Sequence, residues 1–417
     1  MNVLAPEIFD PQTAALEDWQ RTKAPEAALD PNPRSPNTPP RPAWIEIDLQ
    51  QLRRNFDLIN RDKPKGLHLL SVVKDEAYGH GAFEVAKTAV ECGVSFLGLS
   101  TLEEALALRE QGIRGRILLL GERHPEELPV CIAHRLTCCV AESGTVNRLA
   151  SLAAKARGRV PVQVKINTGM NRYGVRWDEA AALARLIHAR KSLVLEGALS
   201  HFAQSDETDK TFARAQCARF KAALEQIAEL RLTIKYRHLC NSGGFLDLSE
   251  AYFDMVRLGI LPLGVYPSSV CRRIEGIQPV MTVKARIAAI QKLQPGETVG
   301  YGMRYTATES RRIAVLPIGY GDGFPRVRNQ GFALVHGRRV PIVGGVAMDA
   351  LTVDITEVPD AQQWDETVLM GRQGEEEISV HEVAKLKNSV SYDVLTGWRS
   401  RLPRIYLNQL PEPFSKS

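Results

Sequence analysis

The sequence predicts an α/β protein, with an N-terminal (β/α)8 TIM barrel followed by a C-terminal, mainly antiparallel β domain. The chain has 417 residues, which is more than one ordinary core holds, so two domains are expected. From Trp44 onward, short runs rich in Val, Ile and Leu alternate with helical patterns, as in βα units around a parallel sheet. After about Gly276 the helical periodicity fades and β-rich runs follow.

Residues 1–42 are expected to form a proline-rich extended arm that ends in DPNPRSPNTPPRP. Proline lacks a backbone N–H group and fixes φ, which disfavours a helix here. No basic stretch followed by an apolar core opens the chain, and nowhere do about 18 apolar residues run together. A cytoplasmic location is therefore expected.

The barrel is expected over residues 43–275, with strands at 67–73, 95–100, 117–121, 162–166, 195–202 and 236–241. Helical patterns lie between these runs. One of them starts with Ser100 or Thr101 as its N-cap, has Glu103 and Glu104 in its first turn, and ends at Gly112. The β domain is expected over residues 276–417, with runs at 281–293, 311–321, 332–345 and 351–356 separated by Gly, Pro and Asp turns.

Charge and cysteine content exclude several classes of function. The net charge of +5 is spread along the chain without a block of Lys or Arg, which argues against a dedicated nucleic-acid surface. The seven cysteines form no C-x-x-C pair, so they are interpreted as reduced, mostly structural thiols, and no metal site is expected.

Polar groups follow the predicted strands at the face where the βα loops of a barrel converge. The strands deliver Lys74, Lys165, His201 and Ser242, and the DMVRLG segment adds Arg257. These cations and hydrogen-bond donors suit an anionic ligand, a phosphate in particular, and the glycines of NSGG and RLGI allow its close approach.

Each of these residues also has an ordinary structural explanation. A lone lysine after a strand is usually a solvated surface charge, His201 and Arg257 can serve packing or ion pairing, and Tyr301 and Tyr305 can be packing aromatics. Lys74, however, ends the apolar run SVVK, where partial desolvation favours a neutral, nucleophilic amine. Together, on one face, the residues favour a functional site.

The segment SVVKDEAYGHG resembles the cofactor-lysine motif of the alanine racemases, which use pyridoxal 5'-phosphate (PLP). The resemblance extends in the same order from about Trp44 to Tyr406. It runs through KINTGMNRYGV (165–175), LSHFAQSDE (199–207), NSGG (241–244), MVRLGI (255–260), VGYGMRYTA (299–307), LPIGYGDG (316–323), AMD (347–349) and SYDVLTGWRSRLPRIY (391–406).

The resemblance implies an enzyme that interconverts L- and D-alanine with two bases. Lys74 would bind PLP and act on one face of the substrate. Tyr301 of a second subunit would act on the other, within a homodimer. Arg257 would face the pyridine nitrogen, and because it stays protonated it would leave the ring a weak electron sink, which suppresses side reactions. His201 would link Arg257 to Tyr301.

Further roles are implied in the same way. The phosphate would be held by Tyr78, Ser242, Gly259, Ile260 and Tyr392. Arg172 would contact the ring oxygen, helped by Lys165, which is often carbamylated in the family, and the Met348 N–H would bind the substrate carboxylate. The implied physiological role is to supply D-alanine for peptidoglycan.

Departures from the family pattern keep other substrates open. Asp75 and Glu76 follow the lysine where Ala-Asn or Ala-Asp is common, and Ala347 replaces a frequent cysteine. A racemase of serine, lysine or arginine is the nearest alternative. A related barrel decarboxylase would need an acidic partner at the ring nitrogen, and a PLP-binding regulatory protein would leave the Tyr301 segment without a role.

Overall fold

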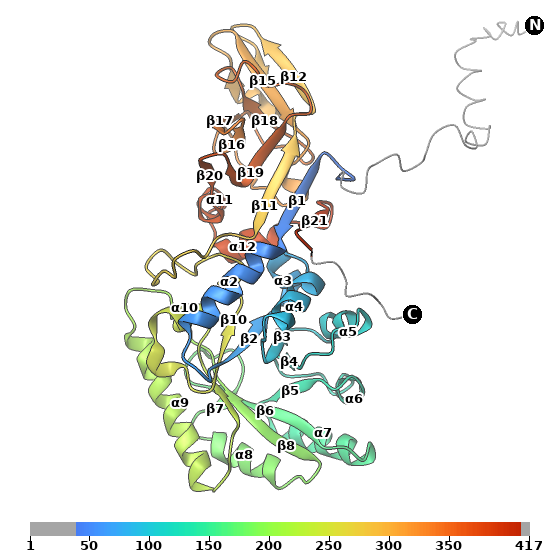
Figure 1. Cartoon of the computed structure of the whole chain (residues 1–417), viewed down its shortest axis with the longest axis vertical. Coiled ribbons are helices and arrows are strands. Elements are labelled where there is room, and N and C mark those ends of the chain that lie inside the picture. Colours follow the sequence, from blue (N-terminus) through green and yellow to red (C-terminus); the bar gives the residue numbers. More distant parts are fainter. Residues whose placement is uncertain (1–38, 410–417) are drawn as a thin grey trace, which may run out of the picture. The chain divides into compact units, whose positions relative to one another are not determined.

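Strands buried on both faces form the parallel sheet of the barrel, which explains their nearly continuous apolar runs (Figure 1). The computed structural model describes residues 39–409, so the arm expected over residues 1–42 lies almost wholly outside the described residues. Strand order is β10-β2-β3-β4-β5-β6-β8-β9. The strands are β2 (His68–Val72), β3 (Phe96–Leu99), β4 (Ile117–Leu119), β5 (Thr137–Val140), β6 (Val160–Asn167), β8 (Leu193–Leu199), β9 (Tyr236–His238) and β10 (Met255–Leu258), and β7 (Val175–Arg176) pairs with β6.

Backbone hydrogen bonds nearly close this sheet into a barrel. β10 pairs with β2, and on its other side Asp254 N donates to Arg237 O and Arg257 N to Cys240 O, each over 3.0 Å. Every pairing along the order is parallel. The predicted barrel is confirmed, and β5 and β10 supply two strands beyond the six runs expected from the sequence.

Helices connect the barrel strands. They are α2 (Leu49–Asp62), α3 (Lys74–Gly79), α4 (Ala82–Glu91), α5 (Leu102–Glu110), α6 (Leu128–Ala133), α7 (Ser143–Lys155), α8 (Ala180–His188), α9 (Thr211–Glu229) and α10 (Ser242–Asp247), with a short 3-10 turn at Ser249–Ala251. Thr101 caps α5, since its hydroxyl accepts from Glu104 N while the Glu104 carboxylate accepts from Thr101 N. This settles the choice left open between Ser100 and Thr101.

The C-terminal sheet is mainly antiparallel, as predicted, in the order β12-β15-β18-β17-β16-β19-β11-β1-β21. β1 (Ala43–Asp48) lies at the start of the range expected for the barrel, yet it pairs with β11 and β21 of this sheet. The other strands are β11 (Met281–Arg286), β12 (Ala289–Leu293), β15 (Arg311–Leu316), β16 (Phe332–Val335), β17 (Arg338–Val343), β18 (Leu351–Asp354), β19 (Glu366–Gln373), β20 (Glu376–Ile378) and β21 (Arg404–Leu407).

A small hairpin and two helices complete this part of the chain. β13 (Thr298–Val299) pairs with β14 (Tyr305–Thr306), and the 3-10 turn Tyr301–Met303 lies between them. A further 3-10 turn spans Tyr320–Asp322, and the helices are α11 (Val380–Lys387) and α12 (Ser391–Gly397). The domain limits expected from the sequence, 43–275 and 276–417, stay predictions.

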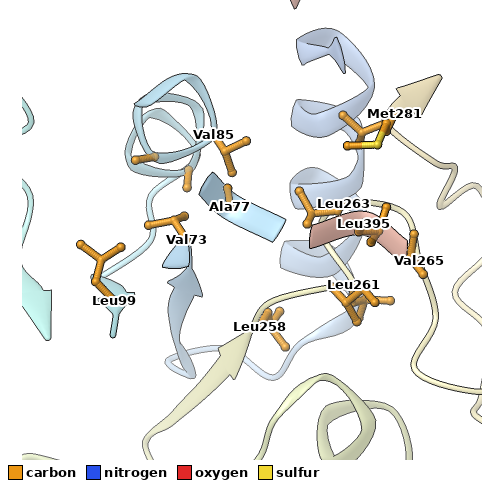
Figure 2. Close-up of a cluster of buried hydrophobic side chains, with 14 of the residues drawn as sticks. Val73, Ala77, Val85, Leu99, Leu258, Leu261, Leu263, Val265, Met281 and Leu395 are labelled. Carbon is orange, nitrogen blue, oxygen red and sulfur yellow. The ribbon is translucent and has the colours of Figure 1, made fainter. Parts of the chain in front are cut away.

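One buried cluster joins the segment after Lys74 to α12 (Figure 2). Ala77 of α3 belongs to the same apolar cluster as Leu263 and Leu395, and Leu395 comes from α12. A Cβ on Gly79 would lie 2.2 Å from the Leu395 carbonyl oxygen, so α12 approaches α3 as closely as a glycine permits. This packing brings α12 to the ends of the barrel strands.

The interior of the barrel contains both apolar and polar side chains. An apolar cluster contains Leu70, Val72, Phe96, Leu118, Cys139, Leu199, Tyr236 and Met255. Strands β6, β9 and β10 also carry four buried polar or charged side chains, Gln163, Lys165, His238 and Arg257. Because side chains alternate along a strand, Gln163 and Lys165 share the inner face of β6. Lys165 and Arg257 line the cavity at the strand ends that carry the predicted site.

Candidate functional site

A cavity of about 660 Å³ lies at the carboxyl ends of the barrel strands. Its volume is in the range of cofactor and small-molecule sites. Ten of the residues predicted from the sequence line it: Lys74, Tyr78, Lys165, Arg172, His201, Ser242, Arg257, Gly259, Ile260 and Tyr392. The carboxylates in the lining are those of Asp75 and Asp393. Cationic groups therefore outnumber anionic ones, and the cavity suits an anionic ligand.

Lys74 begins a left-handed turn made of ordinary L-residues. Asp75, Glu76, Ala77 and Tyr78 have φ values of 52°, 53°, 49° and 55°. Consecutive residues in this region are costly, so the surrounding structure must hold them. Asp75 N donates to Glu104 over 2.6 Å. Strained turns of this kind are typical of functional sites, because they hold a side chain in one orientation.

His80 holds the other end of the turn. Its Nδ1 lies 3.1 Å from Ala77 O and 2.9 Å from Tyr78 O. Both partners are acceptors, so Nδ1 carries the proton and donates. Burial lowers the pKa of His80 to about 4, so the imidazole stays neutral. The turn that carries Lys74 and Tyr78 is thus fixed from both sides.

Tyr78, Ser242 and Gly259 form one end of the cavity. A Cβ on Gly259 would lie 2.5 Å from the Tyr78 hydroxyl oxygen. The Ser242 hydroxyl accepts from Gly259 N over 3.3 Å and from Leu261 N over 3.4 Å. Burial, followed by the charge of Asp75, raises the pKa of Tyr78 to about 12. Tyr392 lies close to Tyr78, with ring centroids 6.1 Å apart. Hydroxyl and N–H donors therefore converge where an anionic group would fit.

Arg257 is a buried cation, only 3% exposed. Its guanidinium donates to the carbonyl oxygens of Ser200, His238 and Leu239 over 2.7–3.2 Å. The same two nitrogens also contact imidazoles, Nη1 at 3.1 Å from His238 Nδ1 and Nη2 at 2.9 Å from His201 Nδ1. No carboxylate of residues 39–409 forms an ion pair with it. Burial lowers the pKa of Arg257 to about 10, so it remains charged at neutral pH.

The neighbouring basic groups are held neutral or nearly so. Burial, then the charges of Arg257 and Lys165, keep the pKa of His201 well below its usual range. Burial, followed by Arg257, lowers the pKa of Lys165 from 10.5 to about 7. Within the described part of the chain, Lys165 Nζ has no hydrogen-bond or ion-pair partner. A large fraction of Lys165 is therefore neutral at physiological pH.

Two of the predicted residues lie elsewhere in the chain. Tyr301 is 82% exposed and Met348 is 51% exposed. Tyr301 lines a separate cavity of about 270 Å³ together with Ala347 and Leu351. Backbone hydrogen bonds from Tyr320 N to Ala347 O and from Gly321 N to Met348 O fix the loop beside it. A single chain therefore does not bring Tyr301 or Met348 together with Lys74.

Several residues at the site were not singled out from the sequence. His238 and Gln163 lie beneath Arg257, Glu104 and His80 hold the Lys74 turn, and Val390 of the segment before α12 lines the cavity. The sequence could have indicated two of them as site residues, because Gln163 and His238 are polar residues inside apolar strands. The role of Glu104 depends on a contact between segments far apart in sequence.

Comparison with known families agrees with this geometry. Residues 47–267 match the family model for the alanine racemase N-terminal domain, and residues 280–406 match that for the C-terminal domain. The chain belongs to the alanine racemase family. This confirms the resemblance and the expected class of enzyme, an amino-acid racemase.

Relatives match nearly the whole racemase length. The alanine racemase of Halothermothrix orenii is 38% identical over 371 residues, which is 89% of this chain and 98% of that protein. The structure of an alanine racemase from Clostridium difficile 630 has a TM-score of 0.84 at 31% identity, covering 89% of this chain and 97% of that one.

Two further solved structures bear on ligands. The alanine racemase of Bacillus anthracis with bound L-Ala-P has a TM-score of 0.81 at 31% identity, covering 88% of this chain and 95% of that one. A histidine racemase from Leuconostoc mesenteroides has a TM-score of 0.81 at 26% identity, covering 89% of this chain and 100% of that one. Among the residues that the structure describes, no helix is both long and apolar enough to cross a membrane.

Proposed function

We propose that this racemase interconverts L- and D-alanine with PLP bound in the 660 Å³ cavity and with a base supplied by each of two subunits. The observation that carries the proposal is the meeting of Lys74, Arg257 and the Tyr78–Ser242–Gly259 end in one cavity. The alanine racemases to which the chain is similar support alanine as the substrate.

The donor chemistry of the cavity fits PLP. Tyr78, Ser242, Gly259, Ile260 and Tyr392 would hold the phosphate, and the close approach of Tyr78 to Gly259 leaves no room there for a larger side chain. Arg257 would hold the ring nitrogen, and Arg172 the ring oxygen. Lys74 would bind the cofactor covalently through its ε-amine, presented by the strained turn.

Bound PLP would supply delocalisation of the negative charge that develops when the substrate loses its α-proton. The chain's own residues then decide where the proton goes. Lys74 Nζ would take it from, or return it to, one face of the α-carbon. A phenol on the opposite face completes the exchange, because inversion requires two groups on opposite sides.

Tyr301 of a second copy is proposed as that phenol. Its 82% exposure in one chain leaves it free to enter another cavity. Met348, 51% exposed, would offer its backbone N–H to the substrate carboxylate from the same surface. His201 accepts from Arg257 at Nδ1, so its proton is on Nε2, from which it can donate to the phenol oxygen. The proposal therefore requires a homodimer.

Lys165 is proposed to carry a carbamate. Its neutral amine would attack the carbon of CO2, forming an N–C bond while one C–O π bond opens to place the negative charge on oxygen, and the nitrogen would release a proton to solvent. The resulting anion would lie among Arg257, Arg172 and Lys74, the charges that act on Lys165 in the cavity. It would thus supply the counter-charge that Arg257 lacks and would help to orient Arg172.

Mixed dimers test the shared site. Lys74→Ala and Tyr301→Phe would each inactivate homodimers, but a mixed dimer contains one site that has both native groups. Refolding equal amounts together should restore about a quarter of wild-type activity, because half of the dimers are mixed and one of their two sites is intact. If mixed dimers form but racemisation is not restored, Tyr301 acts in its own subunit or not at all.

A panel of L-amino acids tests the substrate. Fastest racemisation of alanine is expected, and fastest turnover of serine, lysine, arginine or histidine would replace alanine as the substrate. The cytoplasmic location and the supply of D-alanine for peptidoglycan stay predictions from the sequence and the family.

A further inference from the structure

A line of polar side chains runs down the barrel interior beneath Arg257. Arg257 Nη1 lies 3.1 Å from His238 Nδ1, and His238 Nε2 lies 2.7 Å from Gln163 Oε1. Gln163 Nε2 in turn lies 3.5 Å from Glu196 Oε2. Glu196 forms an ion pair with Arg116. The line connects the cavity with the far end of the barrel.

Each contact fixes the protons of the next. Glu196 accepts from Arg116, so the Gln163 side that faces Glu196 must be its NH2 group, because an amide oxygen there would meet a carboxylate. The amide oxygen of Gln163 then faces His238 and accepts. His238 therefore carries its proton on Nε2 and presents a bare Nδ1 to Arg257, which can only donate.

The opposite tautomer would be costly. A proton on His238 Nδ1 would face the Arg257 N–H group, and two donors would be left against each other in a water-free interior. Gln163 and His238 are both 0% exposed, so solvent cannot supply a replacement partner. Burial and the charges of Arg257 and Lys165 hold the pKa of His238 well below its usual range, so a doubly protonated ring does not relieve the conflict.

The fold makes room for Gln163. In the sheet, Gln163 is paired with Gly197 of β8, and a Cβ on that glycine would lie 2.7 Å from Gln163 Cδ. Any other residue at position 197 would displace the amide from its place. The missing side chain at position 197 therefore leaves the space that the Gln163 amide occupies next to its partners.

We propose that Gln163 is a positioning residue that sets the tautomer of His238 and, through it, the orientation of Arg257 in the cavity. Its effect on turnover rests on the proposed function, because Arg257 acts there on the bound cofactor. Its effect on the His238 ring does not, and can be read in cofactor-free protein.

The alternative is that Gln163 only fills space. Gln163→Leu keeps the approximate volume and removes the acceptor, whereas Gln163→Glu keeps both shape and acceptor. Beside Glu196, the new carboxyl would share a proton with its neighbour, since two carboxylates in contact cannot both ionise readily. In its protonated form, the carboxyl introduced by Gln163→Glu can accept from His238 and donate to Glu196, as the amide does.

Nitrogen NMR of cofactor-free protein labelled at its histidines separates the two explanations. In the wild type, His238, assigned by the loss of its signal in His238→Gln, should show one fixed Nε2–H tautomer. Gln163→Glu should retain it. In Gln163→Leu, Arg257 still favours a bare Nδ1, but the Nε2–H group is left buried without an acceptor, so the Nδ1–H tautomer should also become populated and the two nitrogen shifts should approach each other. An unchanged His238 signal in Gln163→Leu overturns the inference.

The rate of racemisation provides the second test of the inference. Gln163→Leu should lower kcat by about 10- to 100-fold, by analogy with the loss caused by removing the hydrogen-bond partner that orients a metal-binding histidine, and Gln163→Glu should restore most of it. Val162→Ala is the matched control, since it weakens the same strand on its outer, apolar face. If Val162→Ala lowers stability and kcat as much as Gln163→Leu, Gln163 is structural only.

The two proposals fail separately. Wild-type racemisation together with an unaltered His238 tautomer in Gln163→Leu would remove the inference and leave the proposed function. If the His238 tautomer shifts in Gln163→Leu but the wild type racemises no amino acid, the inference is supported and the proposed function is removed.

Discussion

Arg257 Nη2 donates to His201 Nδ1 over 2.9 Å, which leaves the imidazole proton on Nε2. Lysine at position 257 would retain a positive charge but would lack the planar guanidinium that donates hydrogen bonds to three carbonyl oxygens and two imidazoles. Arg257→Lys should therefore lower kcat by about 100-fold and destabilise the fold by about 1–3 kcal/mol, as unpaired buried acceptors do. Racemisation assays and urea unfolding measure both effects.

The control for this change is Arg219→Lys, which alters a guanidinium that donates to Thr168 O outside the 660 Å³ cavity. Racemisation should stay near the wild-type rate in that variant. Arg257→Lys with native kcat would mean that charge alone suffices at this position.

Tyr301→Phe should remove one of the two bases. General acid–base groups contribute about 10²- to 10⁴-fold, so a loss of that size in kcat is expected. Cofactor binding should be retained, because the groups proposed to hold the phosphate and the ring all line the barrel cavity and none belongs to the Tyr301 hairpin. Exchange of the α-proton with deuterium should fall for one enantiomer more than for the other.

Tyr305→Phe is the matched control for the phenol. Tyr305 lies in the same hairpin, but its hydroxyl is 3.5 Å from Asp354. Near-normal turnover is expected from this variant. The reverse pattern, with Tyr305→Phe inactive and Tyr301→Phe active, would transfer the role of base to Tyr305.

Gly259→Ala should weaken cofactor binding. The added methyl group would lie 2.5 Å from the Tyr78 hydroxyl oxygen, so Tyr78 must move away from the end of the cavity. A loss of one hydrogen bond to a charged group corresponds to about 10-fold or more in the dissociation constant. Absorbance titration of cofactor-free protein measures it. Gly158→Ala, where a Cβ meets no atom within 4 Å, should leave the constant unchanged.

The sequence predicted the residues at the strand ends well because the geometry of a parallel barrel is regular. Lys74, Lys165 and His201 follow apolar runs, and the carboxyl ends of those runs meet at one face. Alternation along β6 also places Gln163 and Lys165 on one inner face, although the role of Gln163 depends on its partners across the sheet.

Other features depend on contacts that no local pattern encodes. The left-handed turn at Asp75–Tyr78 contains no glycine, so its φ values follow from the hydrogen bonds of Glu104 and His80 rather than from residue type. Similarly, β1 is extended by its own sequence, but its membership of the C-terminal sheet results from pairing with β11 and β21. Local propensity alone could not have distinguished the two sheets.

Lys165 should make the protein sensitive to pH and to CO2. Its pKa is lowered from 10.5 to about 7, so the unfolded chain binds more protons than the folded one between these values. Stability therefore rises with pH across this window and is lower below about 7, where the amine is charged in both states. The difference in unfolding free energy between wild type and Lys165→Met should follow this curve in CO2-free buffer.

The same neutral amine makes carbamylation possible. Incubation with ¹³C-bicarbonate should label the wild type at a pH above the Lys165 pKa of about 7 and should leave it unlabelled well below that value. Lys165→Arg, which keeps a cation but has no reactive amine at neutral pH, should not be labelled. Because the carbamate would orient Arg172, removal of CO2 should raise KM more than it lowers kcat. A wild type that takes up no label while racemising at full rate would show that the free amine is the working form.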